Sequence, residues 1–380
     1  MAAVHAAEGS AEPPFRFYST VDGLTQSDVY DMAQDSAGYL WFTTARGLNR
    51  YDGKEFEHYT LVDGLPSNNL TALTIDADDT VWVGDTSGGV AVIRSARIEH
   101  VIEPLARAAK PVIDLQVAGD RVLLIVQDAG IMEIVPEGAG YRIEPIGGES
   151  IGATNMAVFG NDVWVASKFG LYRLAFKPKA ELQLVNKNII AVHAAADGTI
   201  WVVTREKRIG IWKNGSIDVR AIIDTVADRV SLTTDGHNTV WVATGGQLFS
   251  FDGNKANVVQ TLDTIQAYDG IDSISSMFVD RENTLWLAGE SRLIRYLGER
   301  FRHFRLKTES DSETVWSISE DNSGHIWFGT QTKLLRLEVD ETLTLIGPER
   351  GIPRGPVRDV VRGTAGAICG RASAGRDCIG

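Results

Sequence analysis

The chain has 380 residues, of which 44% are hydrophobic and 23% are charged, fractions that are ordinary for soluble globular proteins. Its 37 Lys and Arg residues against 50 Asp and Glu residues leave a net charge of −13, which disfavours nucleic acid and anionic membrane surfaces as main partners. No run of about 18 apolar residues occurs, so the sequence shows no membrane-spanning helix. The two cysteines, Cys369 and Cys378, leave the redox compartment open.

Residues 1–14 are predicted to be a signal-peptide remnant or a disordered tail. The small residues around Val4-His5-Ala6 resemble the end of a signal peptide at its cleavage site. The charged region and the apolar core that precede such a site are absent from the sequence.

The stretch that follows has the pattern of four short strands joined by tight turns. A strand over 29–33 leads through a turn at 35–38 into a strand that contains Trp41, and further strands are expected over 48–51 and 55–59. Short runs of β-branched and aromatic residues bounded by Asp-Gly turns predict β-hairpins.

This unit recurs along the chain with Trp, once replaced by Leu, at the same place. The positions are Trp41, Trp82, Leu123, Trp164, Trp201, Trp241, Trp286 and Trp327, which are 37 to 45 residues apart. A period near 40–45 residues is typical of β-propeller blades. We expect four antiparallel strands per blade, arranged radially, with the Trp rings packed between neighbouring blades.

The N-terminal strand is expected to close the ring. Phe15-Arg16-Phe17-Tyr18 resembles the outer strand of a blade, Phe56-Glu57-His58-Tyr59, and a similar motif returns at 301–304, 286 residues later. Trp327 also follows Trp41 by 286 residues. The sequence therefore predicts a seven-bladed propeller over 15–300. Residues 301–380 would hold the first blades of a truncated second propeller with an aberrant C-terminal tail. A single eight-bladed propeller is the alternative.

The unit Val29–Gly53, preceded by Asp22-Gly23-Leu24, resembles the two-component regulator propeller repeat. In that family two such rings form the periplasmic sensor of an inner-membrane receptor, followed by a β-sandwich, a membrane helix and a histidine kinase or diguanylate cyclase. The resemblance implies a ligand-binding periplasmic sensor region that is joined to the membrane only through a C-terminal helix outside this sequence. It also implies a homodimer of the full-length receptor, and no enzyme activity here, because kinase or cyclase activity would lie in that missing part.

Candidate ligand-binding residues lie in the loops four to six residues beyond the Trp positions. These loops carry Arg46, Lys168, Arg205, Lys207 and Arg292. On an acidic protein they would form a positive rim around the mouth of the ring. Such a rim suits a small molecule or an oligosaccharide, with an anionic ligand favoured because Arg binds carboxylate or sulfate in a bidentate manner. The competing interpretation is that they are solvated loop tips.

Two other functions remain open. A streptogramin-lyase-like propeller enzyme would place His193, on an inner strand, near Glu206 or Glu290 beside a divalent metal. The histidines show no metal-binding spacing, so neither a metal nor another cofactor is expected. A protein-binding scaffold would instead dock its partner on one face of the ring.

Overall fold

The structure is a computed structural model. It describes residues 15–104, 110–147, 150–176, 180–223, 226–227, 230–244, 247–253, 260–261, 274–289, 292–296, 315–330, 334–338, 343–346, 357–362, 368–372 and 375–379. The predicted tail over 1–14 and the motif at 301–304 lie outside these residues. The chain divides into two compact units, one of residues 14–300 and one that includes 301–380. The predicted division into domains at 1–14, 15–300 and 301–380 stays a prediction.

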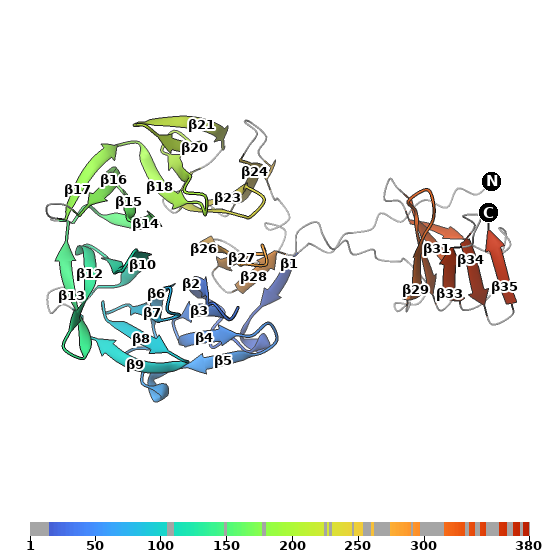
Figure 1. Cartoon of the computed structure of the whole chain (residues 1–380), viewed down its shortest axis with the longest axis horizontal. Helices are drawn as coiled ribbons and strands as arrows, with labels where there is room; N and C mark the ends of the chain where they lie inside the picture. The colour runs from blue at the N-terminus through green and yellow to red at the C-terminus, as the bar shows by residue number, and fades with distance from the viewer. Residues whose placement is uncertain are drawn as a thin grey trace. The chain divides into compact units, whose positions relative to one another are not determined.

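The described strands of the first unit form seven antiparallel four-stranded sheets, arranged as a ring in Figure 1. The first three sheets comprise β2 (Val29–Gln34), β3 (Leu40–Thr44), β4 (Gly47–Tyr51), β5 (Phe56–Tyr59); β6 (Leu70–Ile75), β7 (Val81–Asp85), β8 (Val90–Arg94), β9 (Arg97–Ile102); and β10 (Val112–Ala118), β11 (Arg121–Val126), β12 (Gly130–Glu137), β13 (Gly140–Ile146). The next three comprise β14 (Ala153–Phe159), β15 (Asp162–Ser167), β16 (Gly170–Ala175), β17 (Glu181–Asn186); β18 (Ile189–Ala194), β19 (Ile200–Thr204), β20 (Arg208–Lys213), β21 (Ser216–Ile222); and β22 (Val230–Thr234), β23 (Thr239–Thr244), β24 (Gln247–Asp252), β25 (Gln260–Thr261). The predicted all-β propeller is thus confirmed.

The seventh sheet contains both ends of the ring. It consists of β26 (Ile274–Val279), β27 (Leu285–Gly289), β28 (Arg292–Tyr296) and β1 (Phe15–Tyr18). β1 pairs antiparallel with β28, with Phe15 opposite Tyr296 and Tyr18 opposite Leu293. This is the closure that the sequence predicted for the N-terminal strand, and it holds the ring shut by main-chain hydrogen bonds.

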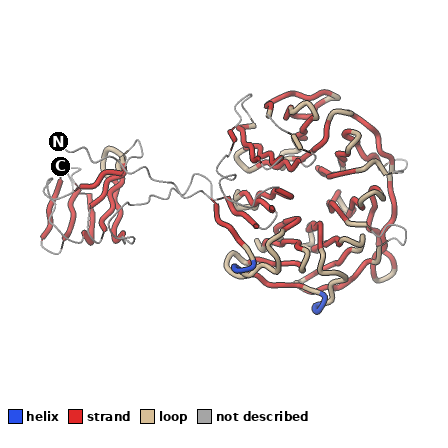
Figure 2. Tube along the Cα trace, turned by 180° about the vertical axis from the view of Figure 1, so that it is seen from behind, coloured by secondary structure: helices blue, strands red, loops and turns tan. Residues whose placement is uncertain are grey.

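Helical structure in the described residues is limited to two 3-10 turns, η1 (Thr20–Asp22) and η2 (Leu61–Asp63), which Figure 2 shows at the periphery of the ring. Each turn follows an outer strand, and each has a capping box and a left-handed glycine at its end. A residue with a positive φ is needed there, so the Asp-Gly-Leu signature before β2 and β6 is a loop-forming device.

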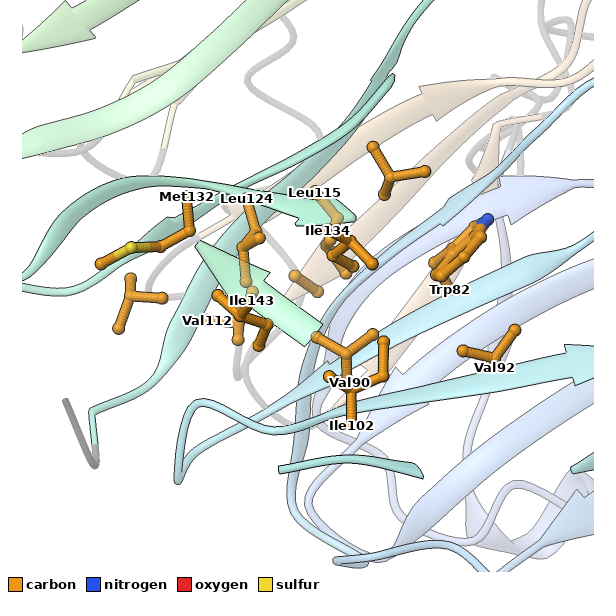
Figure 3. Packing of buried hydrophobic residues seen from close by; sticks show 13 residues of the cluster. Trp82, Val90, Val92, Ile102, Val112, Leu115, Leu124, Met132, Ile134 and Ile143 are labelled. Carbon is orange, nitrogen blue, oxygen red and sulfur yellow. The ribbon is translucent and has the colours of Figure 1, made fainter. Parts of the chain in front are cut away.

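Apolar side chains pack between adjacent sheets. At the junction shown in Figure 3, Trp82 and Val90 of one sheet meet Leu115 and Ile134 of the next. The second-strand indoles are largely inaccessible: Trp41, Trp82, Trp201, Trp241 and Trp286 are 1–6% exposed. Large flat rings between twisted sheets therefore account for the Trp period of the sequence.

In five repeats the aspartate of the turn has a second role that joins it to the Trp. Asp35 accepts main-chain hydrogen bonds from Ala37 and Tyr39, and its other oxygen accepts from Trp41 Nε1 at 2.9 Å. The same bond, across six residues, recurs at Asp76–Trp82, Asp235–Trp241, Asp280–Trp286 and Asp321–Trp327. The fifth sheet is an exception, because Ala195 stands where the aspartate would be and the buried Trp201 Nε1 finds no partner among the described residues.

The second unit repeats the blade plan. It contains β29 (Val315–Glu320), β30 (Ile326–Thr330), β31 (Leu334–Leu337) and β32 (Leu343–Ile346), then a three-stranded sheet of β33 (Val357–Arg362), β34 (Ile368–Ala372) and β35 (Gly375–Ile379). Trp327 packs on Val357 and Val360. Ile318 is 64% exposed, whereas Met32, which occupies the same place in the first sheet, is 5% exposed.

Candidate functional site

A cavity of about 1860 Å³ lies at the centre of the first unit. Its wall is formed by the innermost strand of each sheet: β2, β6, β10, β14, β18, β22 and β26. Six of these strands carry a β-bulge near their start. The bulge residues Tyr30, Thr71, Ile113, Thr154, Ile190 and Ser275 all line the cavity. Because a bulge re-aims the side chain at its position, the bulges decide which residues face this central channel.

Several polar residues of the channel wall also join neighbouring sheets. Asp31 Oδ2 accepts from the main-chain N–H of Leu73 at 2.9 Å, and Asp114 accepts from that of Met156. Asn155 Nδ2 donates to the carbonyl oxygen of Val192 at 2.7 Å. These bonds satisfy buried polar groups and couple the position of one inner strand to that of the next.

Burial sets the protonation of the titratable groups in the wall. It raises the pKa of Asp31 to about 7, with a smaller contribution from the charge of Asp114, and it raises the pKa of Asp114 to about 6. Main-chain hydrogen bonds oppose both increases. Burial lowers the pKa of His193 to about 4. At neutral pH the wall thus holds a neutral imidazole, an ionised Asp114 and a partly protonated Asp31.

The mouth of the channel at the Asp-containing turns is bridged by side chains. Arg281 donates to the carbonyl oxygen of Ser36 at 2.9 Å, and Gln34 Nε2 donates to Glu282 at 3.0 Å. Ser36 in turn donates its N–H to Asp79 at 2.7 Å. These bonds link the neighbouring turns of the seventh, first and second sheets at this mouth, and the turns at 195–197, 235–238 and 280–283 also line the cavity.

The five predicted cations follow the second strands, as expected, but only Lys168 lines the channel. Arg46, Lys168, Arg205 and Lys207 are exposed in their turns. Arg205 Nη2 donates to the carbonyl oxygen of Lys168, so the structure brings these two residues together. Arg292 is half-buried, and its guanidinium lies 5.3 Å from the centre of the Phe17 ring. Ligand binding by these residues stays a prediction.

Two of the residues named for an enzyme, His193 and Glu206, are described by the structure. His193 lines the channel, and its Nε2 lies 3.1 Å from Thr234 Oγ1. Glu206 is exposed and pairs with Arg208 at 3.5 Å, while Glu290 lies outside the described residues. Among the described residues no group of three His, Cys, Asp or Glu side chains is placed to hold a metal ion.

Sequence reasoning missed the bulge residues. They share no residue type, because Tyr, Thr, Ile and Ser all occupy the position. A usable signal was the alignment of the repeats, because in three units the bulge residue comes directly before a polar residue: Asp31, Asn155 and Ser276.

Comparison with known proteins agrees with this architecture. Residues 23–46 and 309–332 match the family described as two component regulator propeller. The chain is therefore a β-propeller protein that carries repeats of this family, and the resemblance seen in the sequence is confirmed. A segment of 45 residues is 47% identical to histidine kinase P4 of Formosa agariphila, and it covers 12% of this chain and 3% of that protein.

Solved structures show the same fold. The extracellular domains of two hybrid two-component systems of B. thetaiotaomicron align with TM-scores of 0.57 and 0.59 at 15% and 17% identity. The alignments cover 96% and 97% of this chain, which spans about half of those domains, 53% and 52%. Virginiamycin B lyase from Staphylococcus aureus aligns with a TM-score of 0.57 at 15% identity, over 74% of this chain and 98% of the lyase. At these identities the likeness establishes the propeller fold. The described residues contain no helix long and apolar enough to cross a bilayer.

Proposed function

We propose that the first unit is the ligand-binding sensor domain of a bacterial transmembrane signalling receptor, of the two-component or diguanylate cyclase type, and that it works in the periplasm. The observation that carries this proposal is the central channel of about 1860 Å³, whose wall combines apolar and polar side chains. Concave sites of this kind bind small molecules through a few well-placed polar groups. The matching repeats and the extracellular receptor domains of the same fold support the proposal.

The proposed ligand is a small molecule or an oligosaccharide that enters at the mouth where the inner strands begin. Binding in the channel would contact inner strands that are tied to one another through Asp31, Asp114 and Asn155. A change at one of these strands would therefore be passed to the neighbouring inner strand. Signalling requires that the ligand bind one arrangement of the receptor, such as one packing of a homodimer, more tightly than another.

The experiment is a ligand screen on the purified chain with a variant that fills the channel. Ile190 lines the channel and lies at the bulge of β18. Ile190→Trp is expected to abolish the thermal stabilisation and the calorimetric binding given by any true ligand. The matched control is Val219→Trp on β21, an outer strand of the same sheet, where the side chain is already 37% exposed. Ligands that bind wild type and Ile190→Trp equally would refute the channel as the site.

A scaffold function makes the opposite prediction. A protein partner that docks on the face of the ring would tolerate Ile190→Trp, because the substituted side chain lies inside the channel. Retention of a stable protein complex by this variant, with no small-molecule binding to wild type, would favour the scaffold.

A further inference from the structure

Positive charge is concentrated in the turns of the fourth and fifth sheets, beside the part of the channel wall that Lys168 lines. The turns that border β15 to β20 in the fourth and fifth sheets present Lys168, Lys187, Arg205, Lys207 and Arg208, all of them exposed. The turns that hold these five residues contain the carboxylate of Glu206, which pairs with Arg208. Asp197 lies in the turn between β18 and β19, and Asp128 lines the channel from the turn before β12. On a chain with a net charge of −13, this local excess creates a surface that attracts anions.

Main-chain and side-chain bonds fix the core of this surface. The N–H of Lys168 donates to the carbonyl oxygen of Gly152 at 3.2 Å, and that of Arg205 donates to Asn188 at 2.8 Å. The Arg205 guanidinium donates to the carbonyl oxygen of Lys168 and so ties the two sheets together. A Cβ on Gly152 would lie 2.7 Å from Lys168 Cε, so the lysine stem runs directly over this glycine. The main chain at both residues is therefore fixed, and the Arg205 guanidinium lies against the Lys168 carbonyl.

An aromatic ring lies beside them. Phe169 is 55% exposed, and Lys168 Nζ lies 5.2 Å from the centre of its ring. An exposed aromatic side chain next to fixed cations offers a flat apolar surface and a charge partner at the same time. The Arg205 guanidinium has five N–H donors, and its bond to Lys168 uses a donor from one terminal nitrogen. The remaining donors can pair with an oxyanion.

We propose that Lys168, Phe169 and Arg205 form a subsite for a ligand that carries a carboxylate beside a six-membered ring with an apolar face. Phe169 stacks on the ring, and Lys168 and Arg205 bind the carboxylate. The inference rests on the proposed sensor function, because Lys168 lines the channel. It narrows the predicted rim to one sector, since Arg292 packs against Phe17 instead.

The test is calorimetric titration of the full chain with a glucuronate-containing disaccharide, with the matching neutral glucose disaccharide, and with phenylacetate. The two acidic probes distinguish a sugar ring from an aromatic ring as the source of the carboxylate. We expect the neutral disaccharide not to bind. Phe169→Ala and Arg205→Ala should each weaken binding of the acidic probe about tenfold or more. Arg46→Ala, an exposed cation in the equivalent turn of the first sheet, should leave it unchanged.

The outcomes separate the subsite from the sensor function. Absence of binding by both acidic probes, or equal losses in Arg46→Ala and Arg205→Ala, would overturn the subsite. If Ile190→Trp abolishes binding while Phe169→Ala does not, the channel binds ligand and the subsite is wrong. If Phe169→Ala abolishes binding while Ile190→Trp does not, the subsite stands without the channel. Phe169 and Arg205 are exposed, so unchanged thermal midpoints would show that both variants fold.

Discussion

Replacing Asp35 by alanine removes the acceptor that serves three donors in the first turn. Trp41 Nε1 bonds to Asp35 at 2.9 Å, and Trp41 is 2% exposed, so water cannot replace the lost partner. Ala37 and Tyr39 are more accessible, and their N–H groups can turn to water. A buried donor left unpaired costs about 1–3 kcal/mol, and a bond to a charged acceptor contributes about 1.5–3 kcal/mol. We therefore expect Asp35→Ala to lower the free energy of unfolding by about 2–3 kcal/mol.

The fifth sheet provides the reciprocal change. Ala195 has the same turn hydrogen bond, to Thr199 at 2.9 Å, that Asp35 has to Tyr39 at 3.0 Å. Trp201 is 1% exposed and its Nε1 lacks a partner in the described part of the chain. Ala195→Asp should supply that partner and raise the free energy of unfolding by about 1 kcal/mol.

Both variants are measured by urea unfolding followed by tryptophan fluorescence, with the m-value checked against wild type. The test is that the free energy of unfolding decreases in Asp35→Ala and increases in Ala195→Asp. If Ala195→Asp destabilises the chain as much as Asp35→Ala, or if Asp35→Ala changes stability by less than about 0.5 kcal/mol, the turn aspartate does not act through the indole.

Three further predictions concern packing, protonation and backbone geometry. Met32→Ala should lower the free energy of unfolding by about 2–5 kcal/mol, because Met32 is buried between sheets. Ile318→Ala should change it by less than about 0.5 kcal/mol, because Ile318 is exposed. Equal effects of the two variants in urea unfolding would show that the Ile318 side chain is covered. The pKa of Asp31 is raised to about 7 from an ordinary value of 3.8, so the folded state binds this proton more tightly than the unfolded state. The free energy of unfolding should therefore be unaffected by Asp31 below about pH 4 and should decrease as the pH rises from there through 7. Asp31→Asn should flatten the stability profile over that window, and an unchanged profile would contradict the shift. Gly47→Ala should lower the thermal midpoint more than Gly53→Ala. Both glycines have a positive φ, but only at Gly47 would a Cβ meet a main-chain oxygen, that of Tyr59, at 2.6 Å. Equal decreases in the midpoint would refute this steric argument.

Much of the fold could be predicted from the sequence because the repeat is local. The Trp period and the Asp-Gly turns specify four-stranded sheets. Phe15–Tyr18 resembles the outer strand of a blade but has no preceding strands in the sequence to pair with, so it could be assigned to ring closure. The constant six-residue interval between Asp35 and Trp41, and in four further repeats, was available as a signal for the indole bond.

The candidate site was less predictable, because it depends on contacts between distant segments. Arg292 stacks on Phe17 only because closure places β1 beside β28. Lys168 and Arg205 meet because adjacent sheets bring their turns together. The bulge at Tyr30, which sets what faces the channel, shares no residue type with the other bulges, so only its place in the repeat could have marked it.

The most direct test of the account is hydrogen–deuterium exchange of the chain with and without a ligand found by screening. If the channel is the binding site, the ligand should slow exchange in the inner strands, including the bulges at Tyr30, Thr154 and Ile190. Protection confined to the outer strands β9, β13 and β17, with the inner strands unchanged, would contradict binding in the channel.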